Sequence, residues 1–254
     1  MIVTLLQTDP VWGDPAANRR AAAELAAKAG PSDLLVFPEM FSTGFATRPE
    51  GMAEEDGATL RFMQELAAGR RCAVAGSVSV RVDGTFRNRF YFVHPDGRVQ
   101  YYDKHHLFTY SGEHLRYTAG EERVIVEHAG FRILLQVCYD LRFPVFSRNR
   151  IAGGRPDYDL ILYVASWPSA RIAAWDALLR ARAIENVCFV AGVNRVGSDP
   201  GNDYPGHSVL IDPKGNLLSI CKENCIDTVS IDLEKDRLDA FRKSFPALED
   251  ADSQ

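Results

Sequence analysis

The two halves of the sequence carry the same apolar segments in the same order, and this repeat constrains the fold more than any other feature. Residues 4–9 (TLLQTD) resemble residues 133–138 (ILLQVC), and residues 33–37 (DLLVF) resemble residues 159–163 (DLILY). Residues 72–76 (CAVAG) resemble 188–192 (CFVAG), and the turn 92–97 (FVHPDG) resembles 210–215 (LIDPKG). Short apolar strands often resemble one another, but ordered matches whose offset stays between 116 and 129 residues indicate a duplication.

The segments between these matches predict alternating strands and helices. We expect strands at 2–7, 34–37 and 72–80, a hairpin from 89–93 and 98–102 around the turn at 94–97, and helices at 16–29 and 60–68. Their counterparts include a helix over 174–186, which the 60–68 helix matches. Ala, Leu and Glu favour helices, whereas short runs that are apolar on both faces are typical of central parallel strands. The pattern therefore predicts an α/β protein, an αββα sandwich of two halves related by a pseudo-two-fold axis.

Bulk properties exclude several classes of protein. The 254 residues suit one large domain or two small ones, and the net charge of −5 without a block of like charges gives no basic surface for nucleic acid or anionic membrane. No apolar run approaches the roughly 18 residues of a membrane span, and the N-terminus lacks the basic start of a signal peptide. Five cysteines without framework spacing are expected to be reduced thiols in a cytoplasmic protein.

Three chemically capable side chains follow predicted strands. Glu39 follows the strand at 34–37, Lys104 follows the hairpin, and Cys138 follows the apolar run 131–137. Ligands of open α/β sheets bind beyond the carboxyl ends of the strands, so one site built from these ends is expected. A thiolate is a nucleophile, a half-buried carboxylate suits a general base, and an ammonium suits an oxyanion. The alternatives are a packing cysteine, a helix-capping glutamate and a solvated lysine.

Other polar residues have weaker signals. Glu113 could orient Lys104 or be merely exposed. No His or Cys spacing typical of zinc is present, and residues 221–225 (CKENC) are predicted to be a strand with two incidental thiols. The arginines of the 174–186 helix are predicted to face solvent, and the alternative is that they make interface contacts. The absence of G-x-S-x-G, P-loop and G-x-G-x-x-G motifs excludes serine α/β-hydrolases and nucleotide-binding Rossmann enzymes.

Three ordered motifs together resemble the nitrilase, or carbon–nitrogen hydrolase, superfamily. They are FPEM at 37–40, YDKHHLF at 102–108 and VCYDLRFP at 137–144. The likeness covers essentially the whole chain and includes RARAIEN at 180–186 and GHS at 206–208. SWP at 166–168, NRVG at 194–197 and FPA at 245–247 are most similar to the omega-amidase branch.

The resemblance implies a single carbon–nitrogen hydrolase domain over residues 1–254 and a Glu39–Lys104–Cys138 triad supported by Glu113. It implies a thioester on Cys138, with the oxyanion held by Lys104 and the backbone N–H of Tyr139. It implies no metal, no organic cofactor and a homodimer or higher homo-oligomer.

An omega-amidase hydrolyses the terminal amide of small 2-oxo-dicarboxylic monoamides, so a cation is expected to meet the distal carboxylate. Arg142, Arg171 and Arg195 are candidates and Trp167 is a candidate wall, although Arg142 could instead pair with Asp140. The alternatives are a deaminated-glutathione amidase, an N-carbamoyl-amine or nitrile hydrolase, an inactive scaffold, and a thiol redox protein.

Overall fold

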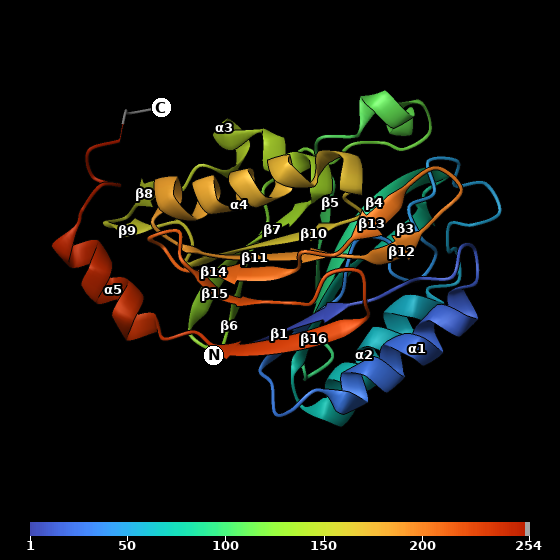
Figure 1. The fold of residues 1–254 in the computed structure, drawn as a ribbon, viewed down its shortest axis with the longest axis horizontal. Helices are drawn as coiled ribbons and strands as arrows, with labels where there is room; N and C mark the ends of the chain where they lie inside the picture. The colour runs from blue at the N-terminus through green and yellow to red at the C-terminus, as the bar shows by residue number, and fades with distance from the viewer. Residues whose placement is uncertain (252–254) are drawn as a thin grey trace.

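The computed structural model describes residues 1–251, except for the side chain of Ala152. Two six-stranded mixed sheets stack face to face, and helices cover their outer faces (Figure 1). The first sheet has the order β16-β1-β2-β3-β4-β5, and its strands are β16 (Asp227–Asp232), β1 (Ile2–Gln7), β2 (Leu34–Val36), β3 (Ala73–Val82), β4 (Thr85–Val93) and β5 (Val99–Asp103). The second has the order β15-β14-β11-β10-β7-β6, and its strands are β15 (Leu217–Ile220), β14 (Val209–Ile211), β11 (Phe189–Asn194), β10 (Leu160–Ala165), β7 (Phe131–Val137) and β6 (Ile125–His128).

The two sheets have the same topology, which confirms the predicted fold class. In each sheet an edge strand pairs antiparallel with the next strand, two parallel pairings follow, and two antiparallel pairings complete the sheet. The strands that correspond are the ones whose sequences repeat: β1 with β7, β2 with β10, and β3 with β11.

Helices pack on the outer face of each sheet. α1 (Pro15–Lys28) and α2 (Ala58–Arg70) lie against the first sheet, and α4 (Ile172–Asn186) lies against the second (Figure 1). The remaining helices are α3 (Pro144–Ser147), α5 (Lys235–Ser244) and the 3₁₀ turns η1 (Thr109–Ser111), η2 (Glu113–Leu115), η3 (Cys138–Arg142) and η4 (Ser169–Arg171). Two small hairpins, β8 (Ile151–Ala152) with β9 (Arg155–Pro156) and β12 (Val196–Ser198) with β13 (Asp203–Pro205), decorate the second half.

Alternation along the strands divides the core into layers. Leu5 of β1 belongs to the core that joins the two sheets, whereas its neighbour Leu6 packs with Leu25 and Met63 of the helices. Successive side chains of a strand point to opposite faces, so a central strand must be apolar on both. The double-sided apolar runs at 34–36 and 160–165 are the buried strands that this rule predicts.

Two local predictions were wrong. Residues 221–225 form a turn instead of the predicted strand, and the Gln7 side chain donates hydrogen bonds to the carbonyls of Lys222 and Cys225. Arg182 of α4 is buried instead of solvated, and its guanidinium donates to the carbonyl of Leu141 at 2.6 Å.

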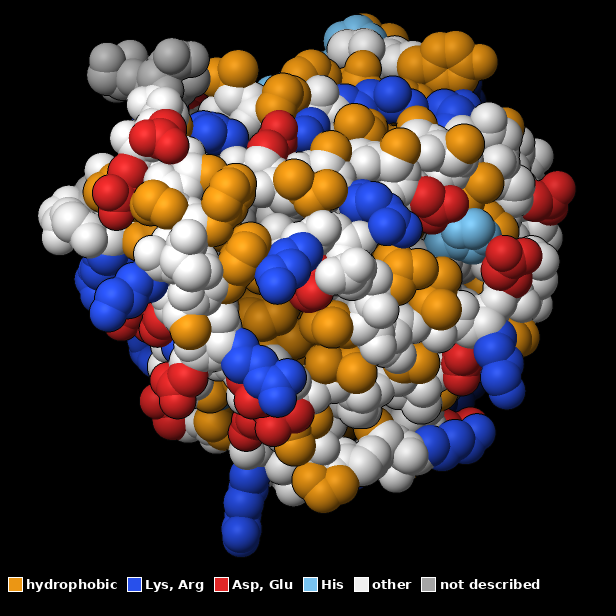
Figure 2. Space-filling view, turned by 60° about the vertical axis from the view of Figure 1, so that its left-hand side comes forward, with side chains coloured by type: hydrophobic (Ala, Val, Ile, Leu, Met, Phe, Trp, Pro, Cys, Tyr) orange, Lys and Arg blue, Asp and Glu red, His pale blue; other side chains and the backbone are white. Residues whose placement is uncertain are grey.

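The surface mixes charges of both signs. Figure 2 shows basic and acidic side chains interspersed with hydrophobic ones on the face that it presents. None of the helices within residues 1–251 is long and apolar enough to cross a lipid bilayer.

Candidate active site

The ends of β2, β5 and β7 bring Glu39, Lys104 and Cys138 to one place between the sheets. The Nζ of Lys104 donates to Oε1 of Glu39 at 2.9 Å and to Oε2 of Glu113 at 2.9 Å. Both carboxylates and the ammonium are removed from solvent, so Glu39 is fully buried instead of half-buried as expected. Burying an ammonium and two carboxylates costs free energy unless the ion pairs have well-fixed geometry. Buried clusters of titratable groups are typical of functional sites, so this cluster is the candidate active site.

Asn88 of β4 bridges the two carboxylates through its side-chain amide. Its Nδ2 donates to Oε1 of Glu39 at 2.8 Å and to Oε1 of Glu113 at 3.3 Å. The backbone carbonyl of Asn88 accepts a hydrogen bond from the backbone N–H of Lys104 at 2.9 Å. Asn88 could not be predicted as a site residue, because a single polar residue in the middle of a strand has no distinctive sequence signal.

The second sheet also holds Glu39. The backbone N–H of Ser166, one residue beyond β10, donates to Oε2 of Glu39 at 2.8 Å, and its hydroxyl donates to the Glu39 carbonyl at 3.3 Å. No sequence motif reveals a backbone donor, so this contact could not have been predicted.

The backbone of Lys104 is fixed by a close approach to Gly120. The N–H of Gly120 donates to the Lys104 carbonyl at 3.0 Å. A Cβ at Gly120 would lie 2.2 Å from the carbonyl oxygen of Asp103, so no other residue fits there without a shift.

Cys138 occupies a strained turn at the tip of β7. Its φ is +47°, a left-handed value that is uncommon for a residue with a Cβ, and it begins the 3₁₀ turn η3. Such conformations cost on the order of 1–3 kcal/mol and cluster at functional sites. Cys138 is buried at the edge of the core and also lines a pocket.

The buried charges control the ionisation of the site. Burial raises the pKa of the Cys138 thiol well above its ordinary value, and the Glu39 carboxylate raises it further, against the opposing effect of Lys104. Burial alone would lower the pKa of Lys104, but Glu113 and Glu39 outweigh it and hold that pKa well above its ordinary value. Burial likewise raises the pKa of Glu113, while Lys104 opposes the shift. The resting thiol is therefore protonated beside a carboxylate that can accept its proton.

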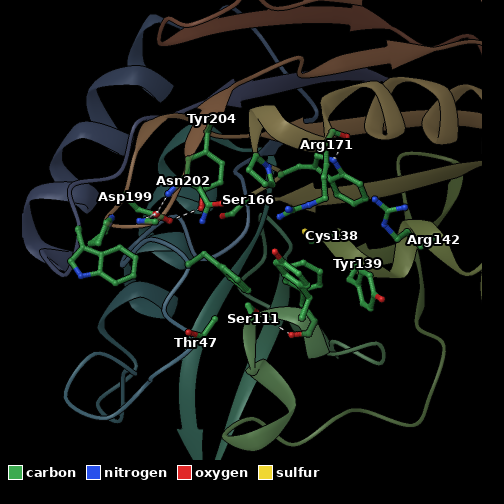
Figure 3. Close-up of a pocket in the computed structure, with 18 residues that line it drawn as sticks. Thr47, Ser111, Cys138, Tyr139, Arg142, Ser166, Arg171, Asp199, Asn202 and Tyr204 are labelled. Atoms are coloured by element: carbon green, nitrogen blue, oxygen red, sulfur yellow. Dashed lines mark hydrogen bonds between the residues drawn. The ribbon is translucent and has the colours of Figure 1, made fainter.

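A pocket of about 220 Å³ opens onto Cys138 (Figure 3). This volume is below the ~300–1,000 Å³ of sites for drug-sized ligands, so the pocket suits a small molecule. Its walls include the aromatic side chains of Phe45, Phe108, Tyr139, Trp167 and Tyr204.

Three of the four predicted substrate-binding residues line this pocket: Arg142, Trp167 and Arg171. The guanidinium of Arg142 lies 5.0 Å from the centre of the Trp167 ring, and that of Arg171 lies 5.3 Å from the centre of the Phe108 ring. In Figure 3 Arg142 lies to the right of Cys138, Arg171 lies above it, and Asn202 lies to its left. The alternative for Arg142 is wrong, because Asp140 is bonded to other groups instead.

Arg195 is not brought to the pocket. Its side chain is fully buried, pairs with Asp9 at 3.2 Å and donates to the carbonyls of Val196 and Ser198. Its guanidinium stacks on the Tyr204 ring, 4.5 Å from the ring centre, and burial lowers its pKa. Arg195 therefore supports the β12–β13 hairpin and does not line the pocket.

Metal ligands do not gather in the part of the chain that the structure describes. Within residues 1–251, no group of three or more His, Cys, Asp or Glu side chains could hold a metal ion. The site is thus built from a thiol, an ammonium and two carboxylates.

Comparisons with known proteins agree on one family. A family model described as carbon-nitrogen hydrolase matches residues 2–243. The chain is 44% identical over 251 residues to the omega-amidase YafV of Yersinia enterocolitica, covering 98% of this chain and 96% of that protein. It is 35% identical over 254 residues to the 2-oxoglutaramate amidase of Bacillus subtilis, with coverage of 98% and 96%.

A solved structure from Xanthomonas campestris is also similar. It is described as a CN-hydrolase superfamily protein with an arsenic adduct in the active site. It superposes with a TM-score of 0.97 at 46% identity and covers 100% of this chain and 98% of its own.

Proposed function

The chain belongs to the carbon–nitrogen hydrolase family and is a hydrolase of carbon–nitrogen bonds, and we propose that it removes the terminal amide of small 2-oxo-dicarboxylic monoamides such as 2-oxoglutaramate and 2-oxosuccinamate. The observation that carries the proposal is the buried Lys104 ammonium, held between Glu39 and Glu113 and interacting electrostatically with Cys138, which lines the pocket. The names of the two relatives supply the substrate class.

In the proposed reaction Glu39 acts as the general base. It accepts the thiol proton of Cys138 while the sulfur attacks the amide carbonyl carbon. The carbonyl oxygen becomes an oxyanion, stabilised by the Lys104 ammonium and the backbone N–H of Tyr139. One donor of this kind is typically worth ~3 kcal/mol of transition-state stabilisation.

Collapse of the tetrahedral intermediate breaks the carbon–nitrogen bond. Glu39 returns its proton to the nitrogen, which leaves as ammonia, and the acyl group remains on Cys138 as a thioester. Glu39 then takes a proton from water while the water oxygen attacks the thioester carbon. The carbon–sulfur bond breaks, the acid is released, and Glu39 returns the proton to the Cys138 sulfur. Covalent catalysis of this kind replaces one difficult step by two easier ones.

The cationic side of the pocket supports an anionic substrate. Arg142 and Arg171 are half-buried, and aromatic rings pack against both guanidinium groups. In the ion pairs that the structure describes within residues 1–251, neither guanidinium is joined to an acidic side chain. Because a guanidinium binds a carboxylate with two parallel hydrogen bonds, these arginines suit the distal carboxylate of the substrate.

An ammonia-release assay tests the proposal. We expect kcat/KM for 2-oxoglutaramate or 2-oxosuccinamate to exceed that for a neutral amide of the same length, an N-carbamoyl amine and an aliphatic nitrile. A preference for an N-carbamoyl amine or a nitrile would contradict the proposed substrate class. Full activity of Cys138→Ser would contradict the proposed nucleophile.

A further inference from the structure

Asp140 lies two residues after Cys138, is fully buried and does not line the pocket, so the proposed reaction gives it no role. Its carboxylate nevertheless accepts four hydrogen bonds. Oδ2 accepts from the backbone N–H of Val137 at 2.9 Å and from the Tyr102 hydroxyl at 2.8 Å. Oδ1 contacts the backbone N–H of His106 at 2.9 Å and its Nδ1 at 2.8 Å. Both oxygens are thus fully occupied by groups of the protein.

The partners of this carboxylate flank the proposed catalytic residues. Val137 directly precedes Cys138, while Tyr102 and His106 lie two positions before and after Lys104. The Lys104 segment follows β5 of the first sheet and the Cys138 turn follows β7 of the second. One buried carboxylate therefore ties together two catalytic segments that belong to different sheets.

Ring stacking joins the same two segments. The His106 ring stacks on Phe143 with centroids 3.8 Å apart and an interplanar angle of 5°. The His105 ring stacks on Phe146 with centroids 4.2 Å apart and an angle of 3°. Both histidines belong to the Lys104 segment, and both phenylalanines follow the Cys138 turn.

We propose that Asp140, with Tyr102 and His106, forms a clamp that positions the Cys138 sulfur relative to the Lys104 ammonium. A left-handed conformation at a residue with a Cβ persists only where the surroundings over-determine it. The bond from the Val137 N–H to Asp140 closes the turn at Cys138, and the bonds to Tyr102 and His106 connect that turn to the Lys104 segment. Asp140 is a positioning residue, and this inference rests on the proposed roles of Cys138 and Lys104.

The chain offers a matched control. Asp159 is also a buried carboxylate that joins distant segments, because it accepts from the backbone N–H of Arg132 at 3.1 Å and from the Arg242 guanidinium at 2.6 Å. It precedes β10 and therefore lies at the opposite end of the sheet from the site. Loss of this carboxylate should affect stability without affecting the reaction.

The test compares Asp140→Asn, Tyr102→Phe and Asp159→Asn with the wild-type protein. Asparagine keeps the shape of aspartate but replaces one acceptor oxygen by an NH₂ group, so two of the four donors lose their partner. A misplacement of 1 Å can cost ~100-fold in rate. By the same reasoning on misplacement, we expect kcat for amide hydrolysis to fall about 100-fold in Asp140→Asn and about 10-fold in Tyr102→Phe. KM should stay within about 3-fold of wild type in both variants, because the substituted side chains do not line the pocket.

A second readout follows the thiol itself. The alkylation rate of Cys138 by iodoacetamide at fixed pH should change in Asp140→Asn and Tyr102→Phe and stay unchanged in Asp159→Asn. Asp159→Asn should lower Tm while kcat, corrected for the folded fraction, remains at the wild-type value.

Several results would overturn the clamp. Wild-type kcat in Asp140→Asn and Tyr102→Phe contradicts it, as does an equal loss of kcat in Asp159→Asn. If Asp140→Asn does not fold, Tyr102→Phe, which removes a single oxygen atom, decides the question alone. Failure of the proposed function looks different, because the wild-type protein would then release no ammonia or Cys138→Ser would remain active.

Discussion

Replacing Glu113 by glutamine should both destabilise the protein and slow its reaction. The Glu113 carboxylate accepts hydrogen bonds from Lys104 Nζ at 3.2 and 2.9 Å, from Asn88 Nδ2 at 3.3 Å and from the Phe108 N–H at 2.6 Å. The glutamine amide has one acceptor oxygen and one NH₂ group, so its nitrogen faces donors whichever way it turns.

The structure gives the size of the effect. If the glutamine oxygen stays toward Phe108, the NH₂ group faces Asn88 and one of the two Lys104 contacts. Two charge-assisted hydrogen bonds are then lost, each worth ~1.5–3 kcal/mol. Because Lys104 keeps Glu39 as a partner, we expect the free energy of unfolding to fall by about 3 kcal/mol, the lower end for breaking a buried pair. A displaced ammonium should lower kcat about 100-fold, the cost of losing one oxyanion donor.

The pH dependence of the free energy of unfolding tests the contact between Glu113 and Lys104 independently. Burial alone would lower the pKa of Lys104, but Glu113 and Glu39 raise it well above its ordinary value. A raised lysine pKa contributes stability that is fully present below the unfolded pKa of ~10.4 and is lost as pH rises through the folded pKa. Without the Glu113 charge the folded pKa falls, so in Glu113→Gln the alkaline loss of stability should still begin near the unfolded pKa but be smaller and end at a lower pH.

Urea unfolding at several pH values and steady-state ammonia release measure these quantities. Glu121→Gln makes the same chemical change at an exposed position and serves as the control. The reasoning is refuted if Glu113→Gln keeps kcat within about 3-fold of wild type and unfolds at the same urea concentration, since the bonds to Glu113 would then contribute neither positioning nor stability.

Two other predictions concern the base and the pocket. Because burial and the Glu39 carboxylate raise the pKa of Cys138, Glu39→Gln should lower that pKa and accelerate iodoacetamide alkylation at pH 8, while ammonia release falls by ~10²–10⁴-fold through loss of the base. A parallel fall in both rates would show instead that Glu39 only maintains the structure. Replacing Arg142 or Arg171 by methionine should raise KM for an anionic amide by ~10–100-fold, the equivalent of one charge-assisted bond, and leave a neutral amide unaffected. Arg237→Met, on the exposed face of α5, is the control, and equal effects on both substrates would exclude a carboxylate contact.

The sequence predicted the layers and the strand ends because those depend on local patterns. The apolar runs at 34–36 and 160–165 are buried on both faces, and the residue types of Glu39, Lys104 and Cys138 are visible where those runs end. The ordered repeat also predicted that the two halves share one topology, which the matching strand orders confirm.

The errors arose where a contact depends on a distant segment. Arg182 lies on a helix whose pattern does not distinguish solvent from the Leu141 carbonyl, which is 41 residues away. Residues 221–225 turn around the side chain of Gln7, more than 200 residues away. Arg195 was expected at the pocket, but its side chain is buried and bonds to Asp9. The adjacent residue, Asn194, instead donates to the carbonyl of Trp167 in the pocket wall.

The supporting residues of the site were invisible for a different reason. Asn88 and the N–H of Ser166 donate hydrogen bonds to Glu39. These bonds form only when the strands that carry the three residues are assembled, so no local sequence pattern predicts them. Asp140 was visible only as one residue of the motif at 137–144, and its four bonds emerge when the ends of β5 and β7 meet.

Trapping the acyl group tests the central claim most directly. The protein is mixed with excess 2-oxoglutaramate, quenched in acid during turnover, and analysed by intact-mass and peptide mass spectrometry. We predict a mass increase equal to the acyl group, located on the peptide that contains Cys138 and absent from Cys138→Ala. An acyl group on Cys72, Cys188, Cys221 or Cys225, or full turnover by Cys138→Ala, would contradict the assignment of Cys138 as the nucleophile.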